Sequence, residues 1–166
     1  MDIYICRGLP ASGKSTWAKY LVRSSLKAAN GQACRLNKDT LREMLHDGVY
    51  SSDNEKLVRE IWKSTIRTCI KHQRTLIIDD CNLNPLTVET VRNLSSLWAR
   101  EMGVPIKIHY LDFKANIETC IKRDSKRDKP VGEKVIRDMA KQYEWKTDPV
   151  PPSLWRTIFK FLFKGK

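Results

Sequence analysis

Four short stretches of the chain carry the apolar patterns that β-strands require. Residues 2–7 and 106–111 alternate between apolar and polar positions, residues 74–79 are mostly apolar, and residues 32–36 form a shorter run. Alternation predicts a strand with one exposed face, whereas a continuous apolar run predicts a strand buried on both faces. We therefore expect four strands.

Between these runs, apolar residues recur at spacings of three and four, which predicts helices. The expected helices span residues 14–28, 40–46, 54–71, 85–101, 116–123 and 133–144. In the fourth of them the apolar face consists of Val88, Val91, Leu94, Trp98 and Met102. Asn84 and Pro85 precede this face and supply a capping side chain and a proline at the first helical position.

Strands that alternate with helices favour an α/β fold, in which helices cover both faces of a parallel sheet of four to five strands. A chain of 166 residues suits one domain with one core, which we expect at residues 1–148. A proline-containing connector and a short basic amphipathic helix are expected at residues 149–166. That helix would dock on the domain's own core, bind a partner protein or lie on a membrane surface.

A phosphate-binding function is indicated by GLPASGKST at residues 8–16, between a predicted strand and a predicted helix. It matches GxxxxGK[ST], in which backbone N–H groups and a helix N-terminus surround phosphate oxygens. Lys14 can reach the β- and γ-phosphates, and the Ser15 hydroxyl can bind Mg²⁺. A glycine-rich turn without a ligand is the alternative. We expect the three-layer P-loop NTPase-type fold, with ATP or another nucleoside triphosphate and Mg²⁺ held by Gly8, Pro10, Ala11, Ser12, Gly13, Lys14, Ser15 and Thr16.

In such folds the phosphates lie beyond the carboxyl ends of the parallel strands, and two stretches there carry carboxylates. Asp39 follows the second predicted strand in LNKDTLR and can orient a hydroxyl nucleophile and accept its proton. Arg42, one turn later, shares that face and can grip a phosphate of the acceptor. The alternative makes Asp39 the N-cap of the next helix. Asp79 and Asp80 end the third strand, and since they alternate we expect only one, Asp80, to face the site.

A basic run, KRDSKRDK at residues 122–129, lies in a region from about residue 120 to 132 that we expect to form a lid. Arg123 and Arg127 are four residues apart, which places both on one side of a helix. From there they would close positive charge over a transferring phosphoryl group. A solvated charged face is the alternative interpretation.

The charge of the chain favours a polyanionic partner. Thirty-one Lys and Arg against nineteen Asp and Glu give a net charge of +12, which attracts polyanions such as nucleic acid. No apolar run reaches the roughly 18 residues of a membrane span, and the N-terminus has no signal-peptide pattern, so we expect a cytoplasmic protein. The five scattered cysteines lack metal-site spacing and are expected to be reduced and mostly buried.

Four motifs together resemble the kinase domain of bacteriophage polynucleotide 5′-hydroxyl kinases. They are GxPxSGKSTWA, N-[KR]-D-x-x-R, D-x-N-L-N-P and K-R-x-S-K-R, and the similarity extends from the first strand to about Tyr143. The bifunctional members of that family continue into a 3′-phosphatase, but no DxDGT-like motif occurs in this sequence. The resemblance therefore implies a kinase without 3′-phosphatase activity, acting in nucleic-acid repair and, if phage-encoded, in the host cytoplasm.

The resemblance also implies a role for each matching residue. Lys14 and Ser15 would serve ATP and Mg²⁺, while Asp39 would be the general base for the 5′-hydroxyl. Arg42 would hold the phosphate next to the acceptor nucleotide, and Asp80 would line the acceptor side of the cleft. Arg123 and Arg127 would be lid groups, with Arg127 on the transferring phosphate. Lys38 stands where an arginine can occur, a mild change for a point charge but not for bidentate binding.

Three functions follow from these observations. The leading one transfers the γ-phosphoryl group of ATP to a 5′-hydroxyl end of DNA or RNA. A small-molecule P-loop phosphotransferase, acting on a nucleoside, sugar or antibiotic hydroxyl, would need neither Arg42 nor a basic surface. An ATP-dependent nucleic-acid-binding module would hydrolyse ATP without transfer. The expected partners are a nucleic-acid 5′-end, a nucleoside triphosphate and, through the C-terminal segment, another protein.

Overall fold

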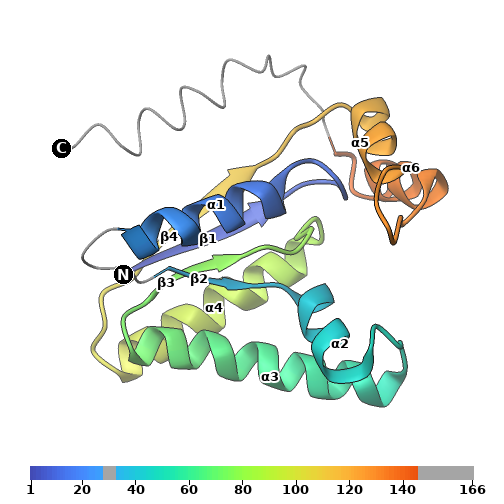
Figure 1. Ribbon diagram of the computed structural model, residues 1–166. Helices are drawn as coiled ribbons and strands as arrows, with labels where there is room; N and C mark the ends of the chain where they lie inside the picture. The colour runs from blue at the N-terminus through green and yellow to red at the C-terminus, as the bar shows by residue number, and fades with distance from the viewer. Residues whose placement is uncertain (28–32, 146–166) are drawn as a thin grey trace, which may run out of the picture. The chain divides into compact units, whose positions relative to one another are not determined.

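The computed structural model describes residues 1–27 and 33–145. In these residues four strands and six helices follow one another in the expected order (Figure 1). They are β1 (Asp2–Arg7), α1 (Lys14–Lys27), β2 (Ala33–Leu36), α2 (Lys38–His46), α3 (Ser52–Lys71), β3 (Thr75–Ile78), α4 (Pro85–Glu101), β4 (Lys107–Asp112), α5 (Ile117–Asp124) and α6 (Glu133–Gln142). The predicted C-terminal connector and helix at 149–166 lie outside the described residues, as do the ends of two predicted elements at residues 28 and 32.

Backbone contacts divide the chain into two compact units. The first comprises Met1–Gly8 and Gly13–Phe113, and therefore holds the whole sheet with α1 to α4. The second comprises Leu9–Ser12 and the chain from Lys114 onward, and holds α5 and α6. The phosphate-loop sequence is thus shared between the two units.

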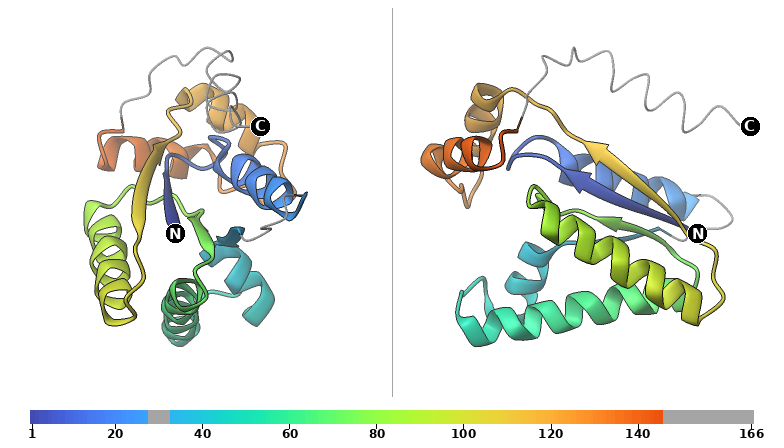
Figure 2. Two further views of the ribbon diagram at one scale, coloured as in Figure 1. Left: turned by 90° about the vertical axis from the view of Figure 1, so that its left-hand side faces the viewer. Right: turned by 180° about the vertical axis from the view of Figure 1, so that it is seen from behind.

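The sheet has the order β2-β3-β1-β4, and all three strand pairs are parallel (Figure 2). Ile3 of β1 lies opposite Leu76 of β3 on one side and Ile108 of β4 on the other. Because the strands are parallel, their carboxyl ends meet at one edge of the sheet. The predicted parallel α/β fold is confirmed.

Successive residues of β1 point to opposite faces of the sheet, and each face is covered by helices (Figures 1 and 2). Ile3 and Ile5 are fully buried in the core that α3 and α4 form with the sheet. On the other face, the Tyr4 ring lies 5.7 Å from the ring of Trp17 in α1. Both faces of the strand are therefore apolar, as expected for a central parallel strand.

Two helices begin earlier than their apolar periodicity predicts, because their caps lie further upstream. Asn37 caps α2 with a side-chain oxygen that accepts from the Thr40 N–H, and Ser51 caps α3 in the same way through the Asn54 N–H. Asp39 is therefore in the first turn of α2, and its alternative interpretation as the N-cap is wrong. The predicted cap of α4 is confirmed, since Asn84 accepts from the Leu86 N–H.

The cysteines follow the expected pattern of burial. Cys6, Cys69 and Cys120 are buried, while Cys34 and Cys81 are half-buried, and all five are free thiols. Burial raises the pKa of the Cys6 thiol well above its usual range, so it stays protonated at neutral pH. None of the helices in the described part of the chain is long and apolar enough to cross a membrane.

Candidate nucleotide-binding and phosphoryl-transfer site

The phosphate-loop sequence connects the end of β1 to the start of α1. Gly8 and Gly13 have φ values of 151° and 109°, a region that residues with a Cβ atom rarely adopt, so glycine is required at both ends of the loop. The Gly8 N–H donates to the Cys81 carbonyl at 2.9 Å, which ties the loop to the chain after β3. The Lys14 ammonium, largely buried, donates to the Gly8 carbonyl at 2.9 Å.

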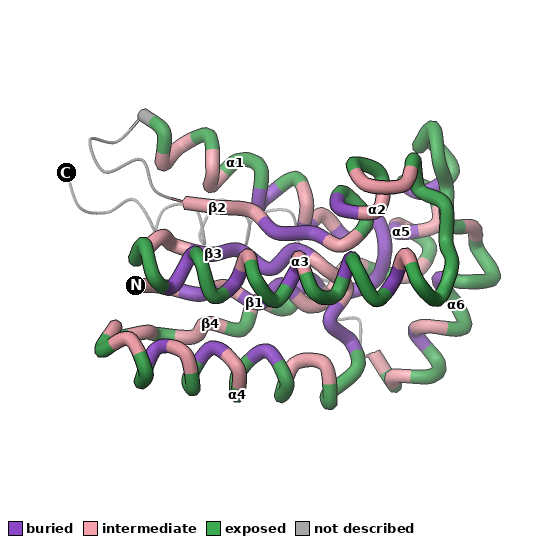
Figure 3. Tube along the Cα trace, turned by 90° about the horizontal axis from the view of Figure 1, so that it is seen from below, coloured by how far each residue is buried: buried purple, intermediate pink, exposed green. Residues whose placement is uncertain are grey.

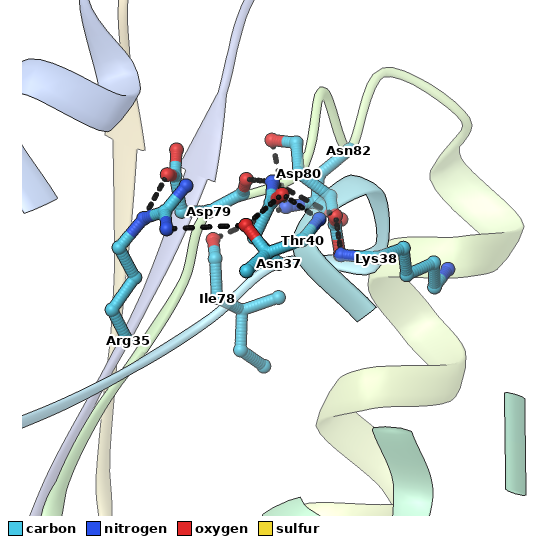
Figure 4. Close-up of polar contacts among 8 residues, drawn as sticks. All are labelled: Arg35, Asn37, Lys38, Thr40, Ile78, Asp79, Asp80 and Asn82. Carbon is cyan, nitrogen blue, oxygen red and sulfur yellow. Dashed lines mark hydrogen bonds and ion pairs between the residues drawn. The ribbon is translucent and has the colours of Figure 1, made fainter. Parts of the chain in front are cut away.

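A polar network occupies the ends of β2 and β3 (Figure 4). Asp79 is fully buried, and its Oδ2 accepts from Arg35 of β2 at 2.6 Å. Asp80 faces the other way, and its Oδ1 accepts from the Lys38 backbone N–H at 2.8 Å. The Asn37 side chain donates to the Asp79 carbonyl, so one residue both caps α2 and joins it to β3. The two adjacent carboxylates thus have separate partners, as their alternation predicts.

Burial makes the Asp80 carboxylate costly to charge. It raises the pKa of Asp80, and the Asp39 and Asp79 carboxylates raise it further, while the Lys38 N–H and ammonium lower it. Within the described residues, Asp79 Oδ1 and Asp80 Oδ2 are buried without a hydrogen-bond partner. A buried carboxylate oxygen without a partner fits water in the coordination shell of Mg²⁺, which prefers oxygen ligands and keeps several waters.

Asn82 holds the turn after β3 in place, a role that the sequence did not reveal. Its backbone has a left-handed φ of 46°. Its buried side-chain amide donates to the Cys6 carbonyl at 2.7 Å and to the Asp80 carbonyl at 3.2 Å. Asn82 therefore fixes Asp80 relative to the end of β1, next to the phosphate loop. The D-x-N-L-N-P motif contained this residue, but nothing in its spacing identified the contact.

Asp39, Arg42 and Glu55 form a linked group of charges at the junction of α2 and α3. The Arg42 guanidinium binds Asp39 Oδ1 at 2.5 Å and both carboxylate oxygens of Glu55, at 2.5 and 3.0 Å. The Asp39 side chain is 85% exposed, whereas that of Glu55 is only 10% exposed. Glu55 thus anchors Arg42 from the protein side, and Arg42 holds an exposed carboxylate on the solvent side. The predicted proximity of Asp39 and Arg42 is confirmed.

Cys81 has several charged groups in its neighbourhood. Burial raises the pKa of Cys81, the Lys14 ammonium lowers it, and the carboxylates of Asp39, Asp80 and Asp79 raise it. All four charges therefore lie within electrostatic range of Cys81, which directly follows Asp80. Lys14 follows β1, while Asp39, Asp79 and Asp80 follow β2 and β3, so all four belong to the edge of the sheet at which parallel α/β folds bind ligands.

The sequence did not indicate a role for Glu55. Its contact with Arg42 provides a test of the charged group that Asp39, Arg42 and Glu55 form. Hydrogen bonding to Arg42 lowers the pKa of Glu55 below its ordinary 4.5, and burial opposes this shift. A carboxyl group with a lowered folded-state pKa stabilises the protein above its unfolded pKa, and this contribution is lost as the pH falls through the folded value. The pair therefore stabilises the fold at neutral pH and ceases to do so in acid.

We expect the Glu55→Gln variant to lose about 1–3 kcal/mol of unfolding free energy at pH 7, because Arg42 then has no buried anion to bind. The difference between wild type and variant should shrink as the pH falls below about 4.5. Urea denaturation at pH 7 and at successively lower pH measures both effects. The Glu60→Gln variant, at an exposed position on the same helix, is the control. Equal losses in the two variants would contradict the anchoring role of Glu55.

The second unit holds the two arginines predicted for the lid, with a geometry different from the expected one. Helix α5 ends at Asp124, so Arg123 is in its last turn and Arg127 is in the turn that follows. The prediction that both share one side of a helix is therefore wrong. The physical reason is the buried Asp124, whose Oδ2 accepts from the Gly132 N–H at 2.9 Å and whose Oδ1 lies 3.4 Å from Arg127. These contacts turn the chain away from the helical path.

The predicted residues are distributed over both units. Gly8, Gly13, Lys14, Ser15 and Thr16 belong to the first unit, and Asp39, Arg42 and Asp80 belong to it as well. The loop residues Pro10, Ala11 and Ser12 belong to the second unit, with Arg123 and Arg127. Ala11 has a left-handed φ of 59°, and the Ser12 N–H donates to the Leu9 carbonyl at 3.2 Å, which closes a tight turn within the loop.

The parallel sheet, the glycine-bounded loop before α1 and the carboxylates beyond β2 and β3 define a P-loop kinase-like domain. A family model described as an AAA domain matches residues 3–145. The chain belongs to this family. No curated protein sequence matches it.

Solved structures of several proteins share the fold, including the following three. A protein in the Pnkp1/Rnl/Hen1 RNA repair complex matches with a TM-score of 0.69 and 22% identity over 90% of this chain and 48% of the other. The chain thus spans about half the length of that relative. A Chloroflexus aurantiacus protein provisionally named a kinase has a TM-score of 0.63 and 16% identity over 99% of this chain and 97% of the other. Shikimate kinase from Acinetobacter baumannii has a TM-score of 0.50 and 16% identity over 99% of this chain and 94% of the other.

Proposed function

We propose that this protein transfers the γ-phosphoryl group of ATP to the 5′-hydroxyl end of a DNA or RNA strand. The observation that carries the proposal is the exposed Asp39 carboxylate, which Arg42 holds at 2.5 Å just beyond the carboxyl end of β2, the edge of the sheet at which β1 enters the phosphate loop. An exposed base held by a guanidinium suits an acceptor that carries its own phosphate. The net charge of +12 suits a polyanionic acceptor as well.

The reaction follows from the roles of the charged groups. O5′ of the acceptor attacks the γ-phosphorus in line with the bond to ADP, and that bond breaks as the new P–O5′ bond forms. Asp39 orients the hydroxyl and accepts its proton. The products are ADP and a strand with a 5′-phosphate. Lys14 neutralises charge on the β- and γ-phosphates, which stabilises the transition state.

Mg²⁺, when bound, neutralises charge on the β- and γ-phosphate oxygens. We propose that the Ser15 hydroxyl, at the start of α1, would bind the metal, and that Asp80 would bind one of its waters. In the described residues no group of three or more His, Cys, Asp or Glu side chains is positioned to hold a metal. Phosphate oxygens and water would complete the coordination of a bound Mg²⁺. Arg123 and Arg127 of the second unit are proposed to bind the nucleotide, with Arg127 on the transferring phosphate.

Replacing Arg42 by alanine should raise the KM for an oligonucleotide at least about 10-fold, while the KM for ATP changes little. Arg42 is proposed to donate a charged hydrogen bond, worth about 1.5–3 kcal/mol, to the phosphate of the oligonucleotide and none to ATP. The variant therefore loses binding free energy for the oligonucleotide only. Initial rates with each substrate varied in turn measure the two constants. Equal increases in both would remove Arg42 from the acceptor site.

The proposal is tested by incubating the protein with γ-labelled ATP and a panel of acceptors. The panel contains 5′-hydroxyl DNA, 5′-hydroxyl RNA, the same strands with a 5′-phosphate, and nucleosides. Label should appear on 5′-hydroxyl strands and be absent from 5′-phosphorylated ones. Label on nucleosides alone would instead establish a small-molecule kinase.

A small-molecule kinase is the second candidate, since shikimate kinase shares the fold over nearly its whole length. The dependence of substrate binding on salt concentration distinguishes the two functions. Affinity for a polyanion falls steeply as salt rises, because binding releases counterions, whereas the KM for a neutral acceptor changes little.

A further inference from the structure

A row of basic residues runs along α3, on a face for which the proposed chemistry has no use. The residues are separated by three, four, four and four positions, and all are exposed: Lys56, Arg59, Lys63, Arg67 and Lys71. At 3.6 residues per turn these spacings keep the side chains within about one third of the helix circumference. We call this row the α3 basic stripe.

The stripe lies beside the core side of its helix. Val58, Trp62 and Ile66 are buried against the sheet and α4, while exposed positions recur along the whole of α3 (Figure 3). Between the two ends of the stripe the sequence contains only one acidic residue, Glu60. Because all five basic residues are exposed, each can contact a ligand in solution.

The stripe is poorly neutralised by the protein itself. Lys56 pairs with Asp53 at 2.8 Å. The other four have no carboxylate within ion-pair distance in the part of the chain that the structure describes. Four like charges on successive turns repel one another, so a polyanion that neutralises them gains binding free energy.

The stripe begins beside the candidate site. Glu55, which anchors Arg42, immediately precedes Lys56 in the first turns of α3. Arg42 is proposed to hold the phosphate next to the 5′-nucleotide. A strand that continues beyond that phosphate therefore has the first residue of the stripe as its neighbour.

We propose that the α3 basic stripe binds the sugar-phosphate backbone of the acceptor strand beyond its first nucleotide; this inference rests on the proposed function. The stripe extends for about 22 Å at 1.5 Å per residue. At 3.4 Å per phosphate of a B-form strand, this length covers about six phosphates. Lysine and arginine contacts to phosphates position a strand without reading its bases, so the stripe binds strands of any sequence.

The test removes three charges from the middle of the stripe in the variant R59Q/K63Q/R67Q. For a 5′-hydroxyl strand of about twenty nucleotides, which covers the stripe, the KM should rise about 10-fold or more. For a dinucleotide acceptor, which is too short to reach the stripe, the KM should not change. The control R23Q/R100Q/K107Q removes the same charge from exposed positions on α1, α4 and β4, and should leave both constants near wild type. Equal effects of the two variants on the long strand would overturn the proposal.

A binding experiment keeps this inference separable from the proposed function. A fluorescent strand with a 5′-phosphate, which is no acceptor, is titrated with each protein at several salt concentrations. The logarithmic salt slope should fall by about 2 in the stripe variant, since each lost contact to a single strand removes about 0.7. If the wild-type protein transfers label from ATP to no strand, the proposed function is wrong. The salt slope still shows whether the α3 basic stripe binds a strand. Stripe-dependent binding to phosphatidylserine vesicles together with stripe-independent binding to the strand would assign the stripe to membranes and overturn the proposal.

Discussion

The Asp39→Asn variant should phosphorylate a 5′-hydroxyl strand about 10²–10⁴-fold more slowly than wild type. Proton transfer to a positioned carboxylate contributes acceleration of this size, and an amide cannot accept the proton. Affinity for ATP should be retained, because Asp39 is proposed to contact the acceptor only. Stability should change by less than about 1 kcal/mol, since the side chain is 85% exposed and its pair with Arg42 is worth little in water. Single-turnover rates, nucleotide titration and thermal melting measure the three quantities.

Asp53 provides a matched control for Asp39. Its side chain is also 85% exposed, and it also pairs with a cation three residues later, Lys56. Asp53→Asn therefore changes the same chemistry on the same kind of surface without touching the proposed base, and it should transfer phosphate at the wild-type rate. A slow Asp53→Asn variant and a fast Asp39→Asn variant would reverse the assignment.

The kcat of the Lys14→Met variant should be about 10²–10³-fold lower than that of wild type. The substitution removes a preorganised positive charge that faces the β- and γ-phosphates. Methionine preserves the length and the apolar part of the side chain, which is only 6% exposed, so the fold should persist. Unlike Asp39→Asn, this variant should also bind ATP more weakly. Stopped-flow rates and calorimetric titration with ATP separate the two losses.

Lys19→Met is the control for Lys14→Met, since Lys19 is exposed on the same helix. It should retain the wild-type kcat and affinity for ATP. Wild-type transfer by Lys14→Met would mean that the loop does not hold the transferring phosphates, and the nucleotide assignment would then be wrong.

Most of the fold could be predicted because its elements depend on local periodicity. The helix from Pro85 to Glu101 has the predicted bounds, since its proline and its cap are adjacent in sequence. Helices α2 and α3 begin two residues early, because the apolar pattern starts after the caps Asn37 and Ser51. The end of α5 was predicted to within one residue, but the expectation that Arg127 shares a helix side with Arg123 was wrong. Asp124 is buried by a contact with Gly132, and no periodicity reports a contact eight residues away.

The positions of the candidate site residues in the fold were predictable where they depend on the ends of parallel strands. Asp39 and Asp80 follow strands of one sheet, so their neighbourhood follows from the topology. Glu55 was not predictable, because it is thirteen residues from Arg42 and resembles any acidic residue in the first turn of a helix. The contact exists only because α2 packs against α3. The α3 basic stripe, by contrast, is visible in the sequence once the bounds of α3 are known.

The most direct measurement is the mass of a 5′-hydroxyl oligonucleotide after incubation with wild-type protein, ATP and Mg²⁺. We expect a gain of one phosphoryl group at the 5′-end, removable by a phosphatase, with one ADP formed for each strand modified. The same strand with a 5′-phosphate should gain nothing. ADP formed with no mass gain on any strand would contradict transfer and leave an ATPase.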